Sequence, residues 1–539
     1  MKNMKIRLFI LLLFIFDASI AESQHAILKA VITDTTWSSD TIRIYNDIVV
    51  EFPATLTISP GIYVEFQGNY SLNVYGRIKA IGTVTDSIFF TVADTNYFAD
   101  TATLAGGWGS IKLLDNPTDT SEFSYCKFSY GKAIDPGHTI NDHLNEENWG
   151  GALFVKNYGN VFCANSCFYN NRANFAGGAI WVKYCSGLKL INNSFIKNQT
   201  FQQGGGASIG SCSTAIISNN LFKLNKAFVT FQTNWGWRVQ GTGGGLRVNV
   251  NCNADILNNK FFNNHAVGGG GFYETTSNCL VSGNIVANNK GTGIMNGHGS
   301  SISTYTNNTI VNNLAYDPNG CGIICNRGLK MRNNIIWGND KVSGWPAYET
   351  IQVYSFGAVM YNFTHSCVQD DYPGEGNVDS YPLFVNPTAG AGPDYDGLSA
   401  DWSLLDSSPC VNTGTPDTTG LNLPATDLLG NPRIYGIRVD MGAIENQMVV
   451  GLPQNPLVNA RIQVSPNPFG QSFKVIAPGR DKISSICLFN QNGQQIATET
   501  MMPFEQMLVF DLHNQSPGLY LLLTRFADGS AETTKLVKY

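Results

Sequence analysis

The middle of the chain repeats one unit many times, and this repeat restricts the possible folds more than any other feature. Each unit holds a cluster of glycines, a short alternating strand pattern and the string Asn-Asn-x-apolar-x-x-Asn. The apolar anchors follow one another at 24 to 27 residues, except for one step of 39 residues that contains an insertion. A fixed period of this length indicates a solenoid of stacked units. The anchors are Phe168, Phe195, Phe222, Phe261, Val286, Ile310 and Ile336.

The composition of the unit decides between the known solenoids. Gly and Asn disfavour helices, and three short strand-like runs fit in one unit, at 178–182, 188–191 and 194–196. A leucine-rich repeat is disfavoured because no Leu-x-x-Leu-x-Leu frame recurs. The unit therefore predicts one coil of a parallel β-helix. Gly and Asn tolerate the left-handed backbone at its corners, stacked Asn side chains can form ladders, and the anchors fill the interior.

The twelve cysteines include four that recur at nearly the same point of successive units: Cys185, Cys212, Cys252 and Cys279. This spacing predicts an interior ladder of buried free thiols, which behave as small hydrophobic groups. Disulfides between coils stay an alternative. Neighbouring strands lie about 4.8 Å apart, which is within the Cα separation that a disulfide allows.

Upstream of the repeat, the chain alternates cleanly in 56–61, 64–66, 74–76 and 88–91. This segment resembles the opening coils of bacterial β-helix surface proteins. With the coils that follow, the resemblance to the right-handed β-helix repeat family covers about residues 41–367. It implies an all-β chain with a right-handed parallel β-helix over residues 22–375, and it implies no particular activity, because this fold hosts many functions.

Residues 376–445 carry the strings Ser408-Pro409-Cys410, Asp427-Leu428-Leu429-Gly430-Asn431-Pro432-Arg433 and Asp440-Met441-Gly442-Ala443-Ile444-Glu445. They resemble the choice-of-anchor region that closes many bacterial β-helix proteins, so we expect a cap on the open stack. Asp427, Asp440 and Glu445 have the charge for Ca²⁺. The favoured interpretation is an ion pair with Arg433 and capping of turns.

A linker over residues 446–462 precedes a short β pattern over 463–539. The pattern contains Ser465-Pro466-Asn467-Pro468, Gln491-Asn492-Gly493, Pro517-Gly518-Leu519-Tyr520 and the final Lys535-Leu536-Val537-Lys538-Tyr539. It resembles the type A sorting domain of type IX secretion. The resemblance implies a small C-terminal β-sandwich that the type IX machinery recognises at the outer membrane. The mature protein is then secreted from, or anchored to the outer surface of, a Gram-negative bacterium of Bacteroidetes type.

The first 21 residues have the pattern of a secretory signal peptide. A positive stretch precedes an apolar run over 8–16, and Ser19-Ile20-Ala21 predicts cleavage between Ala21 and Glu22. No stretch reaches the roughly 20 apolar residues of a membrane-spanning helix. A net charge of −6 without a basic block argues against nucleic acid as a partner.

One string resembles a catalytic motif. Gly297-His298-Gly299 is similar to the GHG motif of polygalacturonase-type hydrolases, and the segment from Arg327 to Lys330 one coil later resembles their RIK motif. Inverting hydrolysis needs two carboxylates, and the matching upstream stretch offers only Glu274. The catalytic candidates that this resemblance gives are His298, Glu274, Arg327 and Lys330, and the set lacks a second carboxylate. A lyase would need a basic residue and a means of neutralising uronate, but basic residues such as Arg172 fit solvated faces.

Two insertions interrupt the coils, and in solenoids such loops gather at the working face. The first, residues 131–149, holds a candidate divalent-cation set, with a solvated acidic loop as the alternative: Asp135, His138, Asp142 and His143. The second, residues 227–241, holds Trp235, Trp237 and Arg238. These side chains either contact a sugar or fix the loop to the coil.

We therefore expect a non-enzymatic, adhesin-like or glycan-binding scaffold that needs no cofactor, with calcium left open. The alternative is a polysaccharide lyase or glycoside hydrolase that acts on an extracellular polysaccharide. Clustered Asp, Glu or Lys on neighbouring coils would favour the enzyme.

Overall fold

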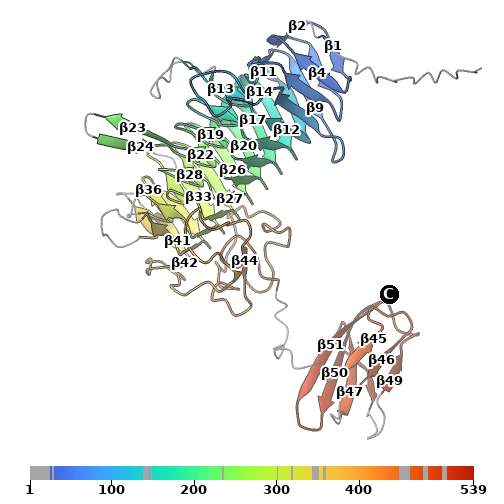
Figure 1. The fold of residues 1–539 in the computed structure, drawn as a ribbon. Coiled ribbons are helices and arrows are strands. Elements are labelled where there is room, and N and C mark those ends of the chain that lie inside the picture. Colours follow the sequence, from blue (N-terminus) through green and yellow to red (C-terminus); the bar gives the residue numbers. More distant parts are fainter. Residues whose placement is uncertain are drawn as a thin grey trace, which may run out of the picture. The chain divides into compact units, whose positions relative to one another are not determined.

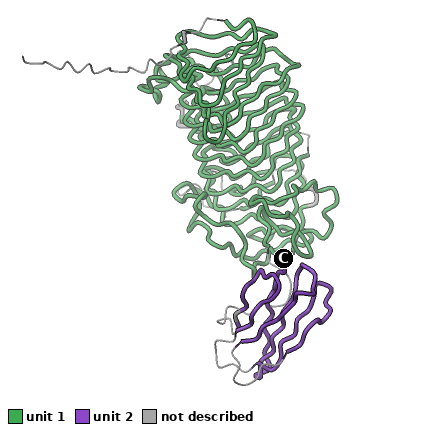
Figure 2. The backbone as a smooth tube through the Cα atoms, turned by 90° about the vertical axis from the view of Figure 1, so that its right-hand side faces the viewer, with its two compact units in different colours: residues 1–448 green, residues 449–539 purple. Residues whose placement is uncertain are grey.

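The computed structural model describes residues 25–26, 30–136, 145, 148–233, 236–299, 302–316, 320–342, 351–355, 360–447, 462–476, 483–499 and 507–539. The chain forms two compact units, residues 1–448 and 449–539 (Figures 1 and 2). Within the described ranges, no helix is long and apolar enough to cross a membrane. The expected signal peptide and its cleavage site at Ala21 and Glu22 lie outside the described residues.

The first unit is the predicted right-handed parallel β-helix, a stack of coils whose strands pair in parallel with the coils above and below (Figure 1). One face, here called the first sheet, has 13 strands. In spatial order these strands are β1 (His25–Ala26), β4 (Thr41–Ile44), β7 (Tyr63–Phe66), β10 (Ile88–Val92), β12 (Cys126–Ser129), β15 (Cys167–Tyr169), β18 (Ser194–Ile196), β21 (Leu221–Lys223), β27 (Lys260–Phe262), β31 (Ile285–Ala287), β34 (Thr309–Val311), β38 (Ile335–Trp337) and β42 (Cys367–Val368).

The second face has two strand positions per coil, which merge into single long strands in the middle of the stack. The merged strands are β11 (Ile111–Ser124), β14 (Leu153–Ala164), β17 (Ile180–Ile191) and β20 (Ala207–Ser218). The strands at the first position are β2 (Ala30–Val31), β5 (Ile48–Val50), β8 (Leu72–Val74), β25 (Leu246–Val248), β29 (Phe272–Glu274), β32 (Ile294–Asn296), β36 (Ile323–Cys325) and β40 (Val353–Ser355). Those at the second position are β3 (Thr35–Trp37), β6 (Thr55–Ile58), β9 (Arg77–Ile81), β26 (Asn253–Leu257), β30 (Asn278–Ser282), β33 (Ser303–Thr306), β37 (Leu329–Arg332) and β41 (Met360–Thr364).

The third face is narrow, with strands of two residues each. They are β13 (Lys132–Ala133), β16 (Arg172–Ala173), β19 (Gln199–Thr200), β22 (Lys226–Ala227), β28 (His265–Ala266), β35 (Leu314–Ala315) and β39 (Asp340–Lys341). An antiparallel hairpin, β23 (Val229–Thr233) and β24 (Gly236–Gln240), follows β22 and projects from the stack (Figure 1).

Stacked rings fill the interior behind the first sheet. Neighbouring rings have centroids 4.6 to 4.9 Å apart and are nearly parallel. These rings belong to Phe90, Phe128, Phe168, Phe195, Phe222 and Phe261, all of which are buried. Val286, Ile310 and Ile336 continue the same register and are also buried. The predicted interior position of the anchors is therefore confirmed.

Asparagine ladders run along the corners of the first sheet. Asn198 Nδ2 donates to Asn225 Oδ1 at 2.9 Å and to the carbonyl of Phe168 at 2.9 Å. The same pattern repeats from Asn171 to Asn339, so the predicted ladders are confirmed. Each buried amide thereby finds partners in the interior, where an unpaired polar group is costly.

Glycine is required where adjacent coils turn close together. Gly177 has φ +66°, in the left-handed region. A Cβ on Gly178 would lie 2.1 Å from the carbonyl oxygen of Gly205 in the next coil. This contact explains why the Gly-Gly pair recurs in the repeat.

The segment expected to cap the stack lies mainly along its side. Val378 bridges to Cys367 at the last strand of the first sheet. Most of the rest covers the outer surface of that sheet and includes two short strands, β43 (Phe384–Asn386) and β44 (Asp401–Leu404). The buried cluster that joins the two consists of Phe262, Ile285, Ala287, Val311, Ile335, Cys367, Phe384, Trp402, Leu404, Cys410, Met441, Ala443 and Ile444. The cap thus shields outward apolar side chains on the last coils.

The second unit is the predicted small β-sandwich. One sheet contains β45 (Gln463–Ser465), β46 (Ser472–Ile476) and β49 (Met507–Asp511), and the other contains β48 (Gln495–Glu499), β47 (Ile483–Asn490), β50 (Gly518–Phe526) and β51 (Ala531–Lys538). Phe473, Leu488 and Leu522 are buried in its core. Its hydrophobic core is separate from the interior of the β-helix.

All twelve cysteines lie in the described part of the chain and are free thiols. Cys212 lies in register with Cys185 and within hydrogen-bond reach of Cys185 and Cys252. The predicted ladder is wrong at its last member, because Cys279 pairs with Ala254 and so stands at the next inward position of the strand. Side chains alternate along a strand, so a shift of two residues keeps a side chain inside but changes its column.

Candidate functional site

Glu274 and Arg327, two of the candidate catalytic residues, form an ion pair inside the stack. Glu274 Oε2 lies 2.8 Å from Arg327 Nη2, and the two side chains are 0% and 1% exposed. Asn296 Nδ2 and Tyr305 OH donate to Glu274 Oε1 at 2.6 and 2.9 Å, and Ser303 Oγ donates to Oε2 at 2.9 Å. Both carboxylate oxygens are therefore occupied, and no substrate reaches them from the surface.

His298 and Lys330, the other two candidates, are exposed on the outside of the stack. The carbonyl of His298 accepts hydrogen bonds from the Thr275 and Thr276 hydroxyls at 2.9 and 3.3 Å. Because Glu274 faces the interior and these two side chains face solvent, the four candidates do not form one site. The hydrolase-like string marks a turn after β32.

Most of the predicted metal loop and the tip of the hairpin lie outside the described residues. Asp135 is described, whereas His138, Asp142 and His143 are not. Trp235 is also outside, and the side chains of Trp237 and Arg238 in β24 are not described. Among the residues that the structure does describe, no group of three or more His, Cys, Asp or Glu side chains could hold a metal ion.

The carboxylates of the cap bind parts of the cap itself. Glu445 Oε2 lies 2.6 Å from Arg433 Nη2, so the expected ion pair is confirmed. Asp427 accepts hydrogen bonds from three backbone N–H groups, and Asp440 accepts from two, at 2.6 Å each. Burial and the neighbouring Glu445 raise the pKa of Asp440 to about 7.

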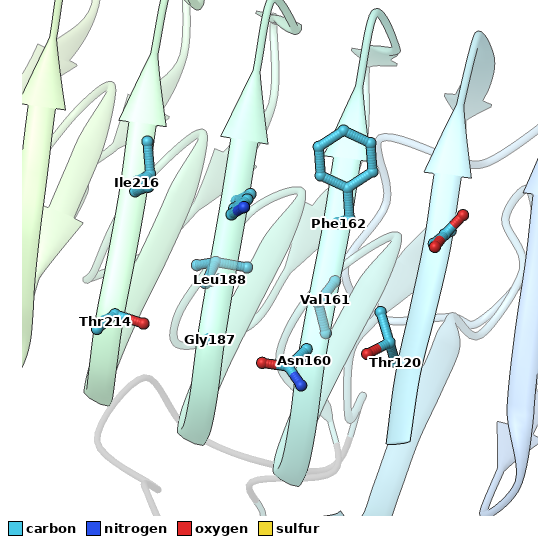
Figure 3. Close-up of a pocket in the computed structure, with 10 residues that line it drawn as sticks. Thr120, Asn160, Val161, Phe162, Gly187, Leu188, Thr214 and Ile216 are labelled. Atoms are coloured by element: carbon cyan, nitrogen blue, oxygen red, sulfur yellow. The ribbon is translucent and has the colours of Figure 1, made fainter. Parts of the chain in front are cut away.

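A shallow groove of about 380 Å³ crosses the second face over β11, β14, β17 and β20 (Figure 3). Glu122, Phe162, Lys189 and Ile216 form one row across it, each in register with the next. The lining residues include a single carboxylate, Glu122. This groove therefore lacks the two carboxylates of an inverting hydrolase.

A row of polar and basic side chains follows the third face. Arg172, Gln199, Lys226 and His265 lie in register on successive coils, and Lys290 continues the row through a bridge to His265. We call these five residues the basic column. Neighbouring parallel strands lie about 4.8 Å apart, so the column extends over about 19 Å.

Aromatic rings flank the basic column. Lys226 Nζ lies 5.5 Å from the centre of the Phe228 ring, and Lys290 Nζ lies 5.7 Å from that of Tyr316. The His265 ring stacks on Phe228 at 4.2 Å, and its Nε2 lies 2.7 Å from Tyr316 OH. The column thus combines cationic groups with ring faces on one surface.

The hydrogen-bond partners of Arg172 are uncharged. Arg172 donates to the carbonyl of Ala99 at 2.7 Å and to Gln199 Oε1 at 2.8 Å. Neither Lys226 nor Lys290 forms an ion pair with a carboxylate within the described ranges. The charge of these cations is therefore not neutralised by the described side chains.

The cations act on one another and on the histidine between them. Burial, Arg172 and Lys290 lower the pKa of Lys226. Burial, Lys226 and Lys290 lower the pKa of His265 to about 3, so His265 is neutral at physiological pH. The column then carries three charges.

The sequence contains a signal for the basic column that our sequence analysis missed. We assigned Arg172 to a solvated face, whereas it is half-buried beside Gln199. The signal is that a polar or basic residue directly follows the ladder asparagine of each of these five units. The pairs are Asn171-Arg172, Asn198-Gln199, Asn225-Lys226, Asn264-His265 and Asn289-Lys290.

Comparison with protein families agrees with the two units. Residues 237–358 match the right-handed beta helix region, and residues 463–539 match the secretion system C-terminal sorting domain. No curated protein matches the sequence. The fold and the tail define an exported β-helix protein. More specifically, the chain is a secreted or cell-surface β-helix protein with a type IX sorting domain, and this tail implies interaction with the secretion machinery.

Proposed function

We propose that this protein is a non-enzymatic, adhesin-like scaffold that binds an extracellular glycan through its third face. The observation that carries the proposal is the basic column with its flanking rings. Aromatic rings pack against the apolar faces of sugars, and cations and amides bind their polar groups. Because the column is built on a rigid stack of strands, little ordering is needed on binding.

The insertions support the choice of face. The first insertion, residues 131–149, contains β13, and the hairpin β23–β24 follows β22, so both insertions begin at the third face. The hairpin begins two residues after Ala227 and carries the predicted contacts Trp235, Trp237 and Arg238. Loops on one face of a solenoid often line its binding surface.

A polysaccharide lyase is the second candidate, and one observation favours it. β-Elimination needs a base, an acid and a cation that neutralises the substrate carboxylate. His265 and Tyr316 share a hydrogen bond beside Lys226 and Lys290. The pKa values argue against catalysis, because burial raises that of Tyr316 to about 12 and that of His265 is about 3. Neither value lies near an ordinary working pH.

The test is to incubate the purified full chain with a panel of neutral and acidic polysaccharides. We expect retention on at least one immobilised glycan and no change in the glycan itself. The double variant Trp235→Ala, Trp237→Ala should weaken this retention. New unsaturated ends would identify a lyase and new reducing ends a hydrolase, and either result would contradict the non-enzymatic scaffold.

A further inference from the structure

The charges of the basic column recur on every second coil. Arg172, Lys226 and Lys290 are cations, and uncharged Gln199 and His265 stand between them. Two coil steps correspond to about 9.6 Å. The parallel register keeps the cations in one line along the stack, so their spacing is a fixed property of the fold.

The column has defined ends. Lys132 precedes Arg172 in register, but it is fully buried, and its ammonium group donates to the backbone carbonyls of Tyr97, Asp100 and Ala105 at 2.7 to 2.9 Å. At the other end, Leu314 follows Lys290, and Asp340 follows Leu314. The surface that attracts anions therefore extends from Arg172 to Lys290.

We propose that the basic column binds an acidic polysaccharide that lies along the stack, with the carboxylate of every second sugar against Arg172, Lys226 and Lys290 in turn. The inference rests on the proposed function and names the ligand class of that site. The intervening sugars face Gln199 and His265, whose uncharged polar groups exchange hydrogen bonds with hydroxyls. The two flanking rings contact sugar faces.

The experiment measures the affinity of the full chain for three probes. The first is a hyaluronan decasaccharide, in which glucuronate alternates with an uncharged amino sugar. The second is a neutral chitin oligosaccharide, and the third is single-stranded DNA, a polyanion without sugar carboxylates. We expect the protein to bind hyaluronan more tightly than either of the others, with an affinity that falls as salt screens the charges.

Two double variants test the cations. Lys226→Gln with Lys290→Gln removes two charges and should weaken hyaluronan binding about tenfold, because each exposed charge pair contributes modestly. Lys226→Arg with Lys290→Arg keeps both charges and should retain binding. Equal binding by all three proteins would overturn the proposal.

A matched control removes two lysines from another face. Lys127 and Lys197 lie over the rings of Phe89 and Tyr169 on the first sheet, at 4.7 and 5.8 Å. Lys127→Gln with Lys197→Gln makes the same change in net charge beside similar rings. Binding should be unchanged, and a loss equal to that of the column variant would overturn the proposal.

The remaining outcomes separate this inference from the proposed function. If the protein is retained on neutral glycans but does not bind hyaluronan, the proposal of an acidic ligand is wrong, and the proposed function as a glycan-binding scaffold still holds. Failure on every glycan overturns both. Tighter binding of DNA overturns the polysaccharide class. If Lys189→Gln abolishes hyaluronan binding and Lys226→Gln does not, the ligand binds in the groove of Figure 3 and the proposal for the basic column is wrong.

Discussion

The Asn-Asn pairs of the repeat assign two tasks to chemically identical side chains. Asn219, the first of its pair, has φ 56° and is exposed, whereas Asn220 is buried and bonds to the next coil. The first task needs a residue that tolerates the left-handed region, and the second needs an amide that donates and accepts. A substitution at the first position therefore changes stability through backbone strain, and one at the second changes it through lost hydrogen bonds.

Replacing a buried ladder asparagine should be much more damaging than replacing the exposed first asparagine of an Asn-Asn pair. Asn225 Oδ1 accepts from Asn198 N and Nδ2 at 3.0 and 2.9 Å. Asn225→Ala leaves these buried donors unpaired, so the free energy of unfolding should fall by about 2 to 4 kcal/mol. The control Asn219→Ala should cost about 1 kcal/mol through left-handed strain. Urea denaturation measures both, and equal losses would contradict the ladder's role.

The interior ion pair should affect stability without affecting ligand binding. Arg327→Met leaves Glu274 charged and buried, which should cost about 3 to 5 kcal/mol. The double variant Arg327→Met, Glu274→Gln should recover part of this loss, because no unpaired charge remains. Denaturation and glycan retention are measured on the same proteins. A folded variant that had lost retention would show that the pair belongs to the binding site.

At the scale of strands, the sequence predicts the features that recur in every unit. It does not predict features that depend on contacts between distant segments. One position per unit carries Phe168, Phe195 or Phe222, so period alone places these rings inside. The location of the cap could not be predicted, because outward Ile335 looks like any other strand residue until the cap covers it. The basic column was missed because strands of two residues are too short to show alternation.

The cap should make one outward position of the first sheet intolerant of charge. Val311 is buried beneath the cap, whereas Ile196 occupies an outward position of the same sheet and is not fully covered. Val311→Lys should lower the free energy of unfolding by about 3 to 5 kcal/mol and increase binding of a hydrophobic dye. Ile196→Lys should change little. Similar effects of the two substitutions would contradict the placement of the cap.

The buried carboxylates of the cap should make stability depend on pH. The pKa of Asp440 is about 7 in the folded chain and roughly 3.9 when unfolded. Between these values the folded state binds more protons, so the free energy of unfolding decreases as pH rises and levels off above about 7. Glu445, whose pKa burial also raises, acts in the same direction.

Because the pKa of His265 is low in the folded chain, His265 makes the free energy of unfolding increase with pH below about pH 6.5. The contribution of Asp440 is therefore isolated by comparing the unsubstituted protein with a variant. In the unsubstituted protein, titration of Asp440 should lower the free energy of unfolding by on the order of 2 kcal/mol between pH 5 and pH 8, and Asp440→Asn should remove this decrease. Urea midpoints at both values measure it. An unchanged difference between the two midpoints would show that Asp440 does not titrate in this range.

The whole molecule combines two units that do not share a hydrophobic core. The interior of the β-helix and the core of the sandwich are built from different residues, and the sorting domain match covers residues 463–539 alone. Short ordered motifs made this tail recognisable from sequence. The basic column was not recognisable in the same way, because only the stacking of five coils brings Arg172 and Lys290 into one line.

Deleting residues 463–539 should separate export from folding. Because the β-helix retains its own core and cap, the shortened protein should keep the urea midpoint of the full chain's first unit. It should nevertheless remain inside the outer membrane of a bacterium that has type IX secretion, since the sorting domain is its route across that membrane. Fractionation of the cells with immunodetection measures its location. A shortened protein found outside the cell would show that the body has a second export signal, and a lower midpoint would show that the tail stabilises the stack.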